Sequence, residues 1–148
     1  MNFYNHDNSC YNHYDQGPNP FVTSLCEDVM HNDNFRTTRW TGSELQLTLM
    51  TIPCNSEIGL EIHCHTDQFL YIESGMGTMM MGKCKETLDY QCRVMSGTGI
   101  FVPKNTWHNL INTGCCPIKL FSIYAPPEHP HGTIHRTKSD SDRAESMQ

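Results

Sequence analysis

Hydrophobic residues in this chain recur in short runs with a period of two, and turn residues separate the runs about every ten positions. Leu45–Ile52 is the clearest run, because its side chains alternate in hydrophobicity as they do along a half-buried β-strand. Further strands are predicted at Phe35–Trp40, Phe69–Ser74, Thr78–Met81, Tyr90–Met95, Ile100–Val102, Trp107–Ile111 and Ile118–Ala125. Gly75-Met-Gly77 predicts a hairpin turn, and Ser24–His31 has room for a short helix. This rhythm predicts an all-β sandwich or barrel.

Composition divides the chain into three parts. Residues 1–19 are polar and rich in Asn, Tyr, His and Asp, so we expect a flexible tail that cannot bury enough apolar surface to order itself. Residues 20–125 contain the predicted strands and form the expected barrel. Residues 126–148 are rich in Pro and His and then charged, and we expect them to pack at the barrel rim before a disordered end.

Charge and cysteine content narrow the class of protein. The net charge is −6 and the sequence has no basic stripe of the kind that binds nucleic acid. No apolar run approaches the roughly 18 residues of a membrane span. The first residues do not form a signal peptide, so we expect a cytoplasmic protein. Eight cysteines without a C-x-x-C pair indicate reduced thiols that pack as small hydrophobes.

Candidate chemistry is concentrated in Leu60-Glu-Ile-His-Cys-His65. Along a strand, Glu61, His63 and His65 would share one face, because successive side chains point to opposite faces. Two imidazoles on one face can converge on one ion, and His is the commonest metal ligand. A second stretch about forty residues on contains Gly97, Pro103, Asn105, His108 and Asn112 in order.

Together the two stretches resemble the two conserved motifs of the cupin family. The first contains a Gly, His-x-His and a closing Gly75, and the second contains Gly, Pro, His and Asn at the family spacing. Asn105 stands where Gly is usual, and both residues tolerate a left-handed turn. The chain from about Gly17 to Lys138 is similar to small single-domain cupins. The resemblance implies a double-stranded β-helix, the jelly-roll cupin barrel, with one divalent metal inside.

The resemblance also implies a ligand set of His63, His65, Gln68 and His108. Gln68 lies seven residues before Gly75, where the family usually has Glu, and offers a neutral carbonyl oxygen. His65 is the least secure of the three histidines, since similar proteins often have an acidic residue there. The ion is Fe, Zn, Mn or Ni, which this donor set does not distinguish.

Glu61 is the candidate catalytic base. Histidines that hold an ion cannot accept a proton, and Gln68 is not basic, so Glu61 is the remaining inward-facing carboxylate of a motif strand. Its structural alternative is a salt bridge to Arg36, Arg39 or Lys119.

The sequence is compatible with two functional classes. One is a metalloenzyme that acts on a small molecule by oxygenase- or isomerase-type chemistry. The other is a non-catalytic cupin that binds a ligand or builds a protective assembly such as a spore coat. In either class we expect a homodimer, because association would cover open strand edges.

Overall fold

The computed structural model describes residues 14–147. Their helices and strands are α1 (Leu25–His31), β1 (Arg36–Thr41), β2 (Gln46–Ile52), β3 (Asp67–Ser74), β4 (Met76–Gly82), β5 (Tyr90–Met95), β6 (Gly99–Val102), β7 (Trp107–Asn112), β8 (Ile118–Ala125), β9 (Ile134–His135) and α2 (Lys138–Ser146). Strands dominate, so the all-β prediction is confirmed. No helix within this range is long and apolar enough to cross a membrane.

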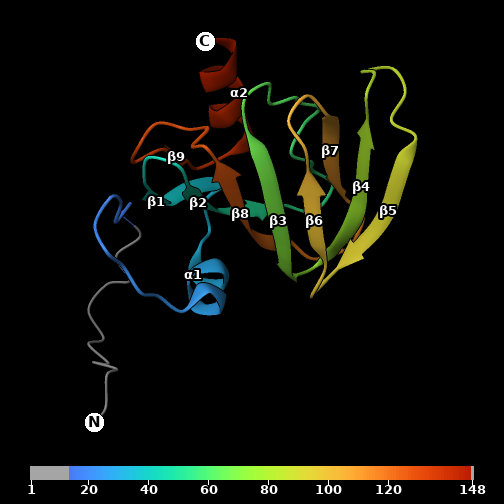
Figure 1. Ribbon diagram of the computed structural model, residues 1–148. Helices are drawn as coiled ribbons and strands as arrows, with labels where there is room; N and C mark the ends of the chain where they lie inside the picture. Colours follow the sequence, from blue (N-terminus) through green and yellow to red (C-terminus); the bar gives the residue numbers. More distant parts are fainter. Residues whose placement is uncertain (1–13, 148) are drawn as a thin grey trace.

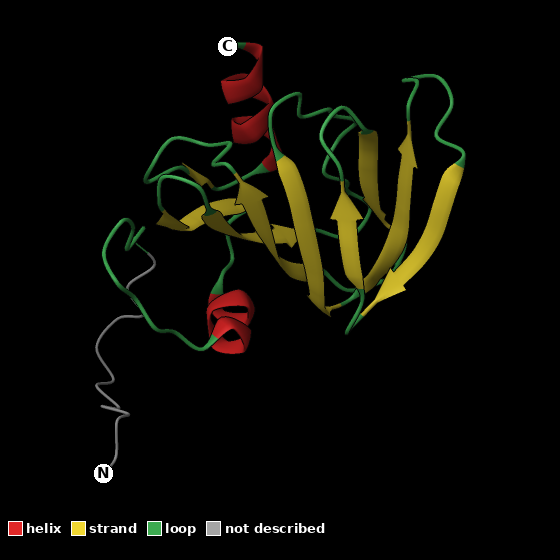
Figure 2. Cartoon of the chain, in the orientation of Figure 1, coloured by secondary structure: helices red, strands yellow, loops and turns green. Residues whose placement is uncertain are grey.

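Two antiparallel sheets form the body of the protein. One contains six strands in the order β6-β3-β8-β2-β1-β9, and the other contains three in the order β5-β4-β7. They face each other as the two layers of a jelly roll, with α1 outside one sheet and α2 above one end (Figures 1 and 2). β2 is buried at nearly every position, polar ones included, because α1 packs outside β2 while the core lies inside.

The core fills the space between the sheets with aliphatic side chains. Its members come from both layers and include Met50, Ile52, Leu70, Ile72, Met79, Leu110, Ile118 and Leu120. Each is at most 1% exposed. Burying one such side chain stabilises the fold by about 1.5–3 kcal/mol.

At Gly75 the chain crosses from one sheet to the other, so the hairpin predicted at Gly75-Met-Gly77 is wrong. β3 pairs with β6 and β8, whereas β4 pairs with β5 and β7. At Gly75 φ is +95°, and a Cβ there would lie 2.7 Å from the Pro117 carbonyl oxygen. The alternating pattern located both strands, but it carries no information about which neighbour each strand pairs with.

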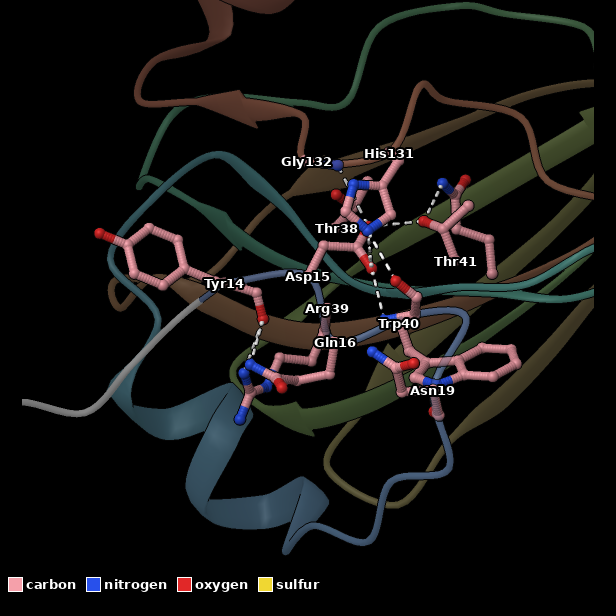
Figure 3. Close-up of polar contacts among 12 residues, drawn as sticks. Tyr14, Asp15, Gln16, Asn19, Thr38, Arg39, Trp40, Thr41, His131 and Gly132 are labelled. Carbon is pink, nitrogen blue, oxygen red and sulfur yellow. Dashed lines mark hydrogen bonds and ion pairs between the residues drawn. The ribbon is translucent and has the colours of Figure 1, made fainter.

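Residues 14–19 pack against β1, where the sequence predicted a tail; residues 1–13 lie outside the described part. The buried Asp15 carboxylate accepts hydrogen bonds from Thr41 Oγ1 (2.6 Å), Gly17 N (3.0 Å) and Gly132 N (3.2 Å), and lies 3.3 Å from His131 Nε2 (Figure 3). Although burial opposes ionisation, these hydrogen bonds, with that from Thr41 first, hold the pKa of Asp15 below its usual range. Asp15 therefore fixes the C-terminal segment to the sheet.

The C-terminal residues are ordered where disorder was predicted. β9 pairs with β1, and α2 begins with a capping box in which Thr137 and Asp140 each accept a hydrogen bond from the other's backbone N–H. Arg36 Nη1 donates to Ser141 Oγ, which attaches α2 to β1. A helix that is polar on most faces gives no hydrophobic period, which is why the pattern missed it.

Candidate metal centre

Backbone pairing brings the two motif stretches together. Glu61 and His108 form an antiparallel bridge in which each N–H donates to the other's carbonyl oxygen at 3.0 Å. Residues directly opposite in such a pair present their side chains to the same face. Asn105 takes a left-handed conformation, with φ of +62°, and its N–H donates to the His63 carbonyl oxygen at 2.8 Å. The tolerance of Asn for this turn therefore helps to place His63 beside the bridge.

Glu61, His63 and His108 converge on one point inside the barrel. Glu61 Oε1 lies 3.2 Å from His108 Nε2 and 3.4 Å from His63 Nε2. The three candidate donor atoms all lie within 4.8 Å of one another. Their side chains are 12%, 7% and 1% exposed for Glu61, His63 and His108 respectively, so little water reaches them.

The outer ring nitrogens fix how both imidazoles are protonated. His108 Nδ1 lies 2.8 Å from the Thr106 carbonyl oxygen, and His63 Nδ1 lies 3.2 Å from Glu128 Oε1. Both partners accept hydrogen bonds, so both Nδ1 atoms carry hydrogen and donate it. In the neutral rings the Nε2 lone pairs then face the Glu61 carboxylate. Three electron-rich atoms facing each other require a cation or a proton between them.

Electrostatics in the metal-free state agree with this requirement. Burial favours the neutral form of Glu61, but its contacts with His108 and His63 hold its pKa well below the usual range. Burial disfavours the charged form of His63, yet the carboxylates of Glu128 and Glu61 raise its pKa to about 9. Without metal, a proton on His63 supplies the missing positive charge.

The donor set fits a divalent ion. Zinc-like ions bind His nitrogen and carboxylate oxygen at about 2.0–2.2 Å, which places adjacent donors about 3.2–3.5 Å apart at near-tetrahedral angles. The separations from Glu61 Oε1 match that range. His63 Nε2 is buried and makes no hydrogen bond to any described residue. A bound cation would satisfy it.

The other two predicted ligands differ from each other. His65 lies outside the group of donors, whereas Gln68 is buried. The chain leaves the extended conformation after His63, so strand alternation fails and His65 is exposed, outside the group. Gln68 is 4% exposed, and its Nε2 donates to Ser122 Oγ at 2.8 Å. Its Oε1 is buried without a partner among residues 14–147 and remains available as a donor atom.

The surroundings of Glu61 favour a metal donor over the catalytic base predicted from the sequence. It lies inside the barrel and forms no ion pair with Arg36, Arg39 or Lys119 among the described residues. A carboxylate held as the anion between two imidazoles fits a metal donor and is a weak proton acceptor. From the sequence, His63, His65, Gln68 and His108 filled the donor positions, so Glu61 remained as the predicted base.

Sequence reasoning missed Glu128. Its segment, Pro126-Pro127-Glu128, has no periodicity, and only the folded chain shows that it reaches His63. Contact with His63 helps to lower the pKa of Glu128 against the effect of burial. A carboxylate that accepts from the outer N–H of a ligating His orients the ring and raises its basicity.

A cavity of about 370 Å³ opens beside Glu61 and His63. Its walls come from residues 60–63 and from the C-terminal part of the chain, namely Leu60, Glu61, Ile62, His63, Glu128, His129, Pro130, Thr133, His135, Ala144 and Glu145. The last two lie on α2, which sits over this end of the barrel (Figure 1). The cavity has room for a small molecule.

Two neutral polar groups lie at the cavity, His129 in its wall and Tyr124 against the rings of His129 and His63. The Tyr124 ring lies 5.6 Å from that of His63 and 5.2 Å from that of His129, measured between centroids. Burial raises the pKa of Tyr124 to about 12, and burial together with Arg36 lowers that of His129 to about 3. Both groups are therefore neutral at physiological pH, and neither Tyr124 Oη nor His129 Nε2 has a hydrogen-bond partner among the described residues.

Comparisons of sequence and of structure with known proteins agree with the fold described above. The family described as "Cupin domain" matches residues 48–124. The uncharacterized protein YrkC of Bacillus subtilis is 52% identical over 131 residues, covering 88% of this chain and 70% of YrkC. The uncharacterized protein L612 of Acanthamoeba polyphaga mimivirus is 34% identical over 115 residues, covering 77% and 70%. The crystal structure of BH2720 from Bacillus halodurans has a TM-score of 0.87 at 48% identity, covering 88% of this chain and 98% of that one.

Proposed function

Since this chain belongs to the cupin family, we propose that it binds one divalent metal ion through Glu61, His63 and His108 and acts as a metalloenzyme on a small polar molecule. The observation that carries the proposal is the convergence of three donor atoms, with His63 Nε2 unsatisfied, next to the 370 Å³ cavity that Glu61 and His63 line. Gln68 Oε1 is the candidate fourth donor.

Oxygenase- or isomerase-type chemistry suits this arrangement. A bound divalent ion supplies Lewis acidity that polarises an oxygen of the ligand. Glu128 keeps His63 in the tautomer that presents Nε2. His129 and Tyr124 offer neutral hydrogen-bonding groups near the ligand, and α2 limits the access of water.

Metal analysis of the purified protein tests the first half of the proposal. We expect one equivalent of a divalent ion in the wild type and none in His63→Ala or His108→Ala, measured by elemental analysis and calorimetric titration. His65→Ala is the matched control, since its ring is exposed and outside the group, and it should bind as the wild type does. Loss of metal in the control, or full retention in His63→Ala, would contradict the assignment.

Ligand binding tests the second half. With Mn²⁺ as the bound ion, small polar ligands in the cavity should show paramagnetic line broadening that disappears in His63→Ala. A metal-loaded protein that broadens no member of a broad library of polyols, acids and carbonyl compounds would favour a non-catalytic cupin.

We also propose a homodimer that associates through an aromatic face of the six-stranded sheet. Phe101, Phe69, Phe121 and Tyr71 form a ladder with centroid separations of 4.9, 6.3 and 5.3 Å, and Phe101 is 74% exposed. Contiguous exposed aromatic surface is typical of interaction sites. Light scattering should give 34 kDa, twice 17.0 kDa, for the wild type. Phe101→Asp should give the monomer, whereas Tyr90→Asp, on the other sheet and 59% exposed, should not.

A further inference from the structure

Four sulfur-containing side chains surround a surface pocket at the far end of the barrel from the candidate metal centre. The pocket has a volume of about 400 Å³ and is lined by Met76, Met95, Cys115 and Cys116 together with Ser and Gly residues. Met76 begins β4, whereas Met81 of the same strand pairs with His108, so the two sites are separated by five residues, about 17 Å of strand. In Figure 1 the β3–β4 junction lies at the end opposite α2.

Strand register places the two thioethers together. Met76 and Met95 are directly opposite each other in the antiparallel pair β4–β5, so their side chains lie on the same face. They are 44% and 50% exposed, so both side chains are accessible from solvent. A Cβ on Gly114 would lie 2.8 Å from Met76 Cγ, so the glycine lets Met76 rest against the turn that carries the cysteines.

Asn112 holds that turn in a fixed shape. Its Nδ2 donates to the carbonyl oxygens of Ile52 (3.1 Å), Pro53 (3.1 Å) and Cys116 (2.9 Å), and its Oδ1 accepts from Gly114 N (3.0 Å). Cys115 and Cys116 follow one another on this turn. Both thiols are exposed and free of disulfide bonds, so they are available to a ligand.

We propose that this pocket binds one soft monovalent metal ion, Cu(I), through the sulfur atoms of Cys115, Cys116, Met76 and Met95. Thiolate and thioether donors favour Cu(I), whereas hard divalent ions prefer oxygen and imidazole donors, and no carboxylate or imidazole is among the described residues that line the pocket. On binding, the two S–H bonds break and two protons pass to solvent, while Cu(I) forms two bonds to the thiolate sulfurs and two to the thioether sulfurs. Copper keeps its oxidation state, so no oxidant is required. The site is independent of the proposed Glu61, His63 and His108 centre.

Competition for Cu(I) with bicinchoninate, under anaerobic reducing conditions, tests the proposal on the full chain. The wild type should take up one equivalent, and Cys115→Ser/Cys116→Ser should lower the affinity by about 100-fold or more. Met76→Leu/Met95→Leu preserves the thiols and should lower it by about tenfold. His63→Ala should bind Cu(I) as the wild type does.

Cys84→Ser/Cys92→Ser is the matched control, because both thiols are exposed and outside the pocket. Equal losses in the control and in Cys115→Ser/Cys116→Ser would mean non-specific thiol binding and overturn the proposal. So would unchanged affinity in Met76→Leu/Met95→Leu. X-ray absorption of the copper-loaded wild type should show sulfur neighbours alone, and a nitrogen or oxygen shell would also overturn the assignment.

Discussion

Glu128 Oε1 lies 3.2 Å from His63 Nδ1, while Glu61 Oε1 lies 3.4 Å from Nε2 of the same ring. One imidazole therefore joins the C-terminal segment to the candidate metal centre. The inner carboxylate is placed to share an ion with His63, and the outer one is placed to orient the ring.

Glu128→Ala should weaken metal binding by about 10- to 100-fold, because it removes the acceptor that fixes the His63 tautomer. Glu128→Gln keeps an acceptor oxygen and should lose much less. Calorimetric titration of the metal-free protein measures both. Glu145→Ala is the control, since Glu145 lines the same cavity without an ion pair among the described residues. Equal effects of Glu128→Ala and Glu145→Ala would point to general electrostatics of the cavity and contradict a positioning role.

The metal-free protein should lose stability as pH rises from about 6.5 to 9. His63 has a raised pKa of about 9 in the folded state against 6.5 when unfolded, so its contribution is fully present below pH 6.5 and disappears as the folded group deprotonates. The loss amounts to about 2–3 kcal/mol, or a Tm lower by about 5 °C or more. Thermal melts of wild type and His63→Gln measure it by difference. A wild-type Tm that tracks the variant across this range would show that the charge on His63 contributes nothing.

Replacing Gln68 tests the fourth donor position. If Gln68 Oε1 faces the ion, Gln68→Glu places a charged oxygen there and should tighten binding by at least about tenfold, or about 1.4 kcal/mol. Gln68→Leu should weaken it. If both variants bind the metal as tightly as the wild type, Gln68 is not a ligand. Its hydrogen bond to Ser122 is then its structural role.

Ala substitutions at two glycines with similar backbone angles can distinguish the cost of conformational strain from the cost of steric overlap. Gly75 and Gly97 have φ of +95° and +89°, but a Cβ would meet the Pro117 carbonyl oxygen at 2.7 Å in the first and nothing within 4 Å in the second. Gly97→Ala should therefore cost about 1–2 kcal/mol from the left-handed backbone alone. Gly75→Ala should cost several kcal/mol more because backbone must move. Urea denaturation measures the free energy of unfolding of both variants. Equal losses would mean that the backbone at Gly75 shifts at little cost to accommodate a Cβ.

Local patterns predicted the strands but not their partners. Leu45–Ile52 and Ile118–Ala125 were found because alternation is a property of each strand by itself, and they differ from β2 and β8 by at most one residue. The hairpin at Gly75 was wrong because sheet pairing depends on contacts between distant segments. The polar α2 was missed because its capping box, not a hydrophobic face, marks its beginning.

The candidate site was predictable only as far as the chain stays extended. Strand parity placed Glu61 and His63 on one face, and it failed at His65 because the backbone bends after His63. His108 followed from the second motif. Glu128 comes from a segment that reaches the site through a proline-rich path held by Asp15 and its contact with Gly132, which no periodicity describes.

The candidate ion donors and much of the cavity wall belong to different stretches of the chain. Glu61, His63 and His108 lie in the middle, whereas His129, His135 and Glu145 all come from the last twenty or so residues. Substitutions at His129, His135 or Glu145 would therefore reshape the wall that a ligand meets without replacing any candidate ion donor. Selectivity for the ligand and affinity for the ion are in this sense separately adjustable, and Glu128 is where the terminal stretch touches both.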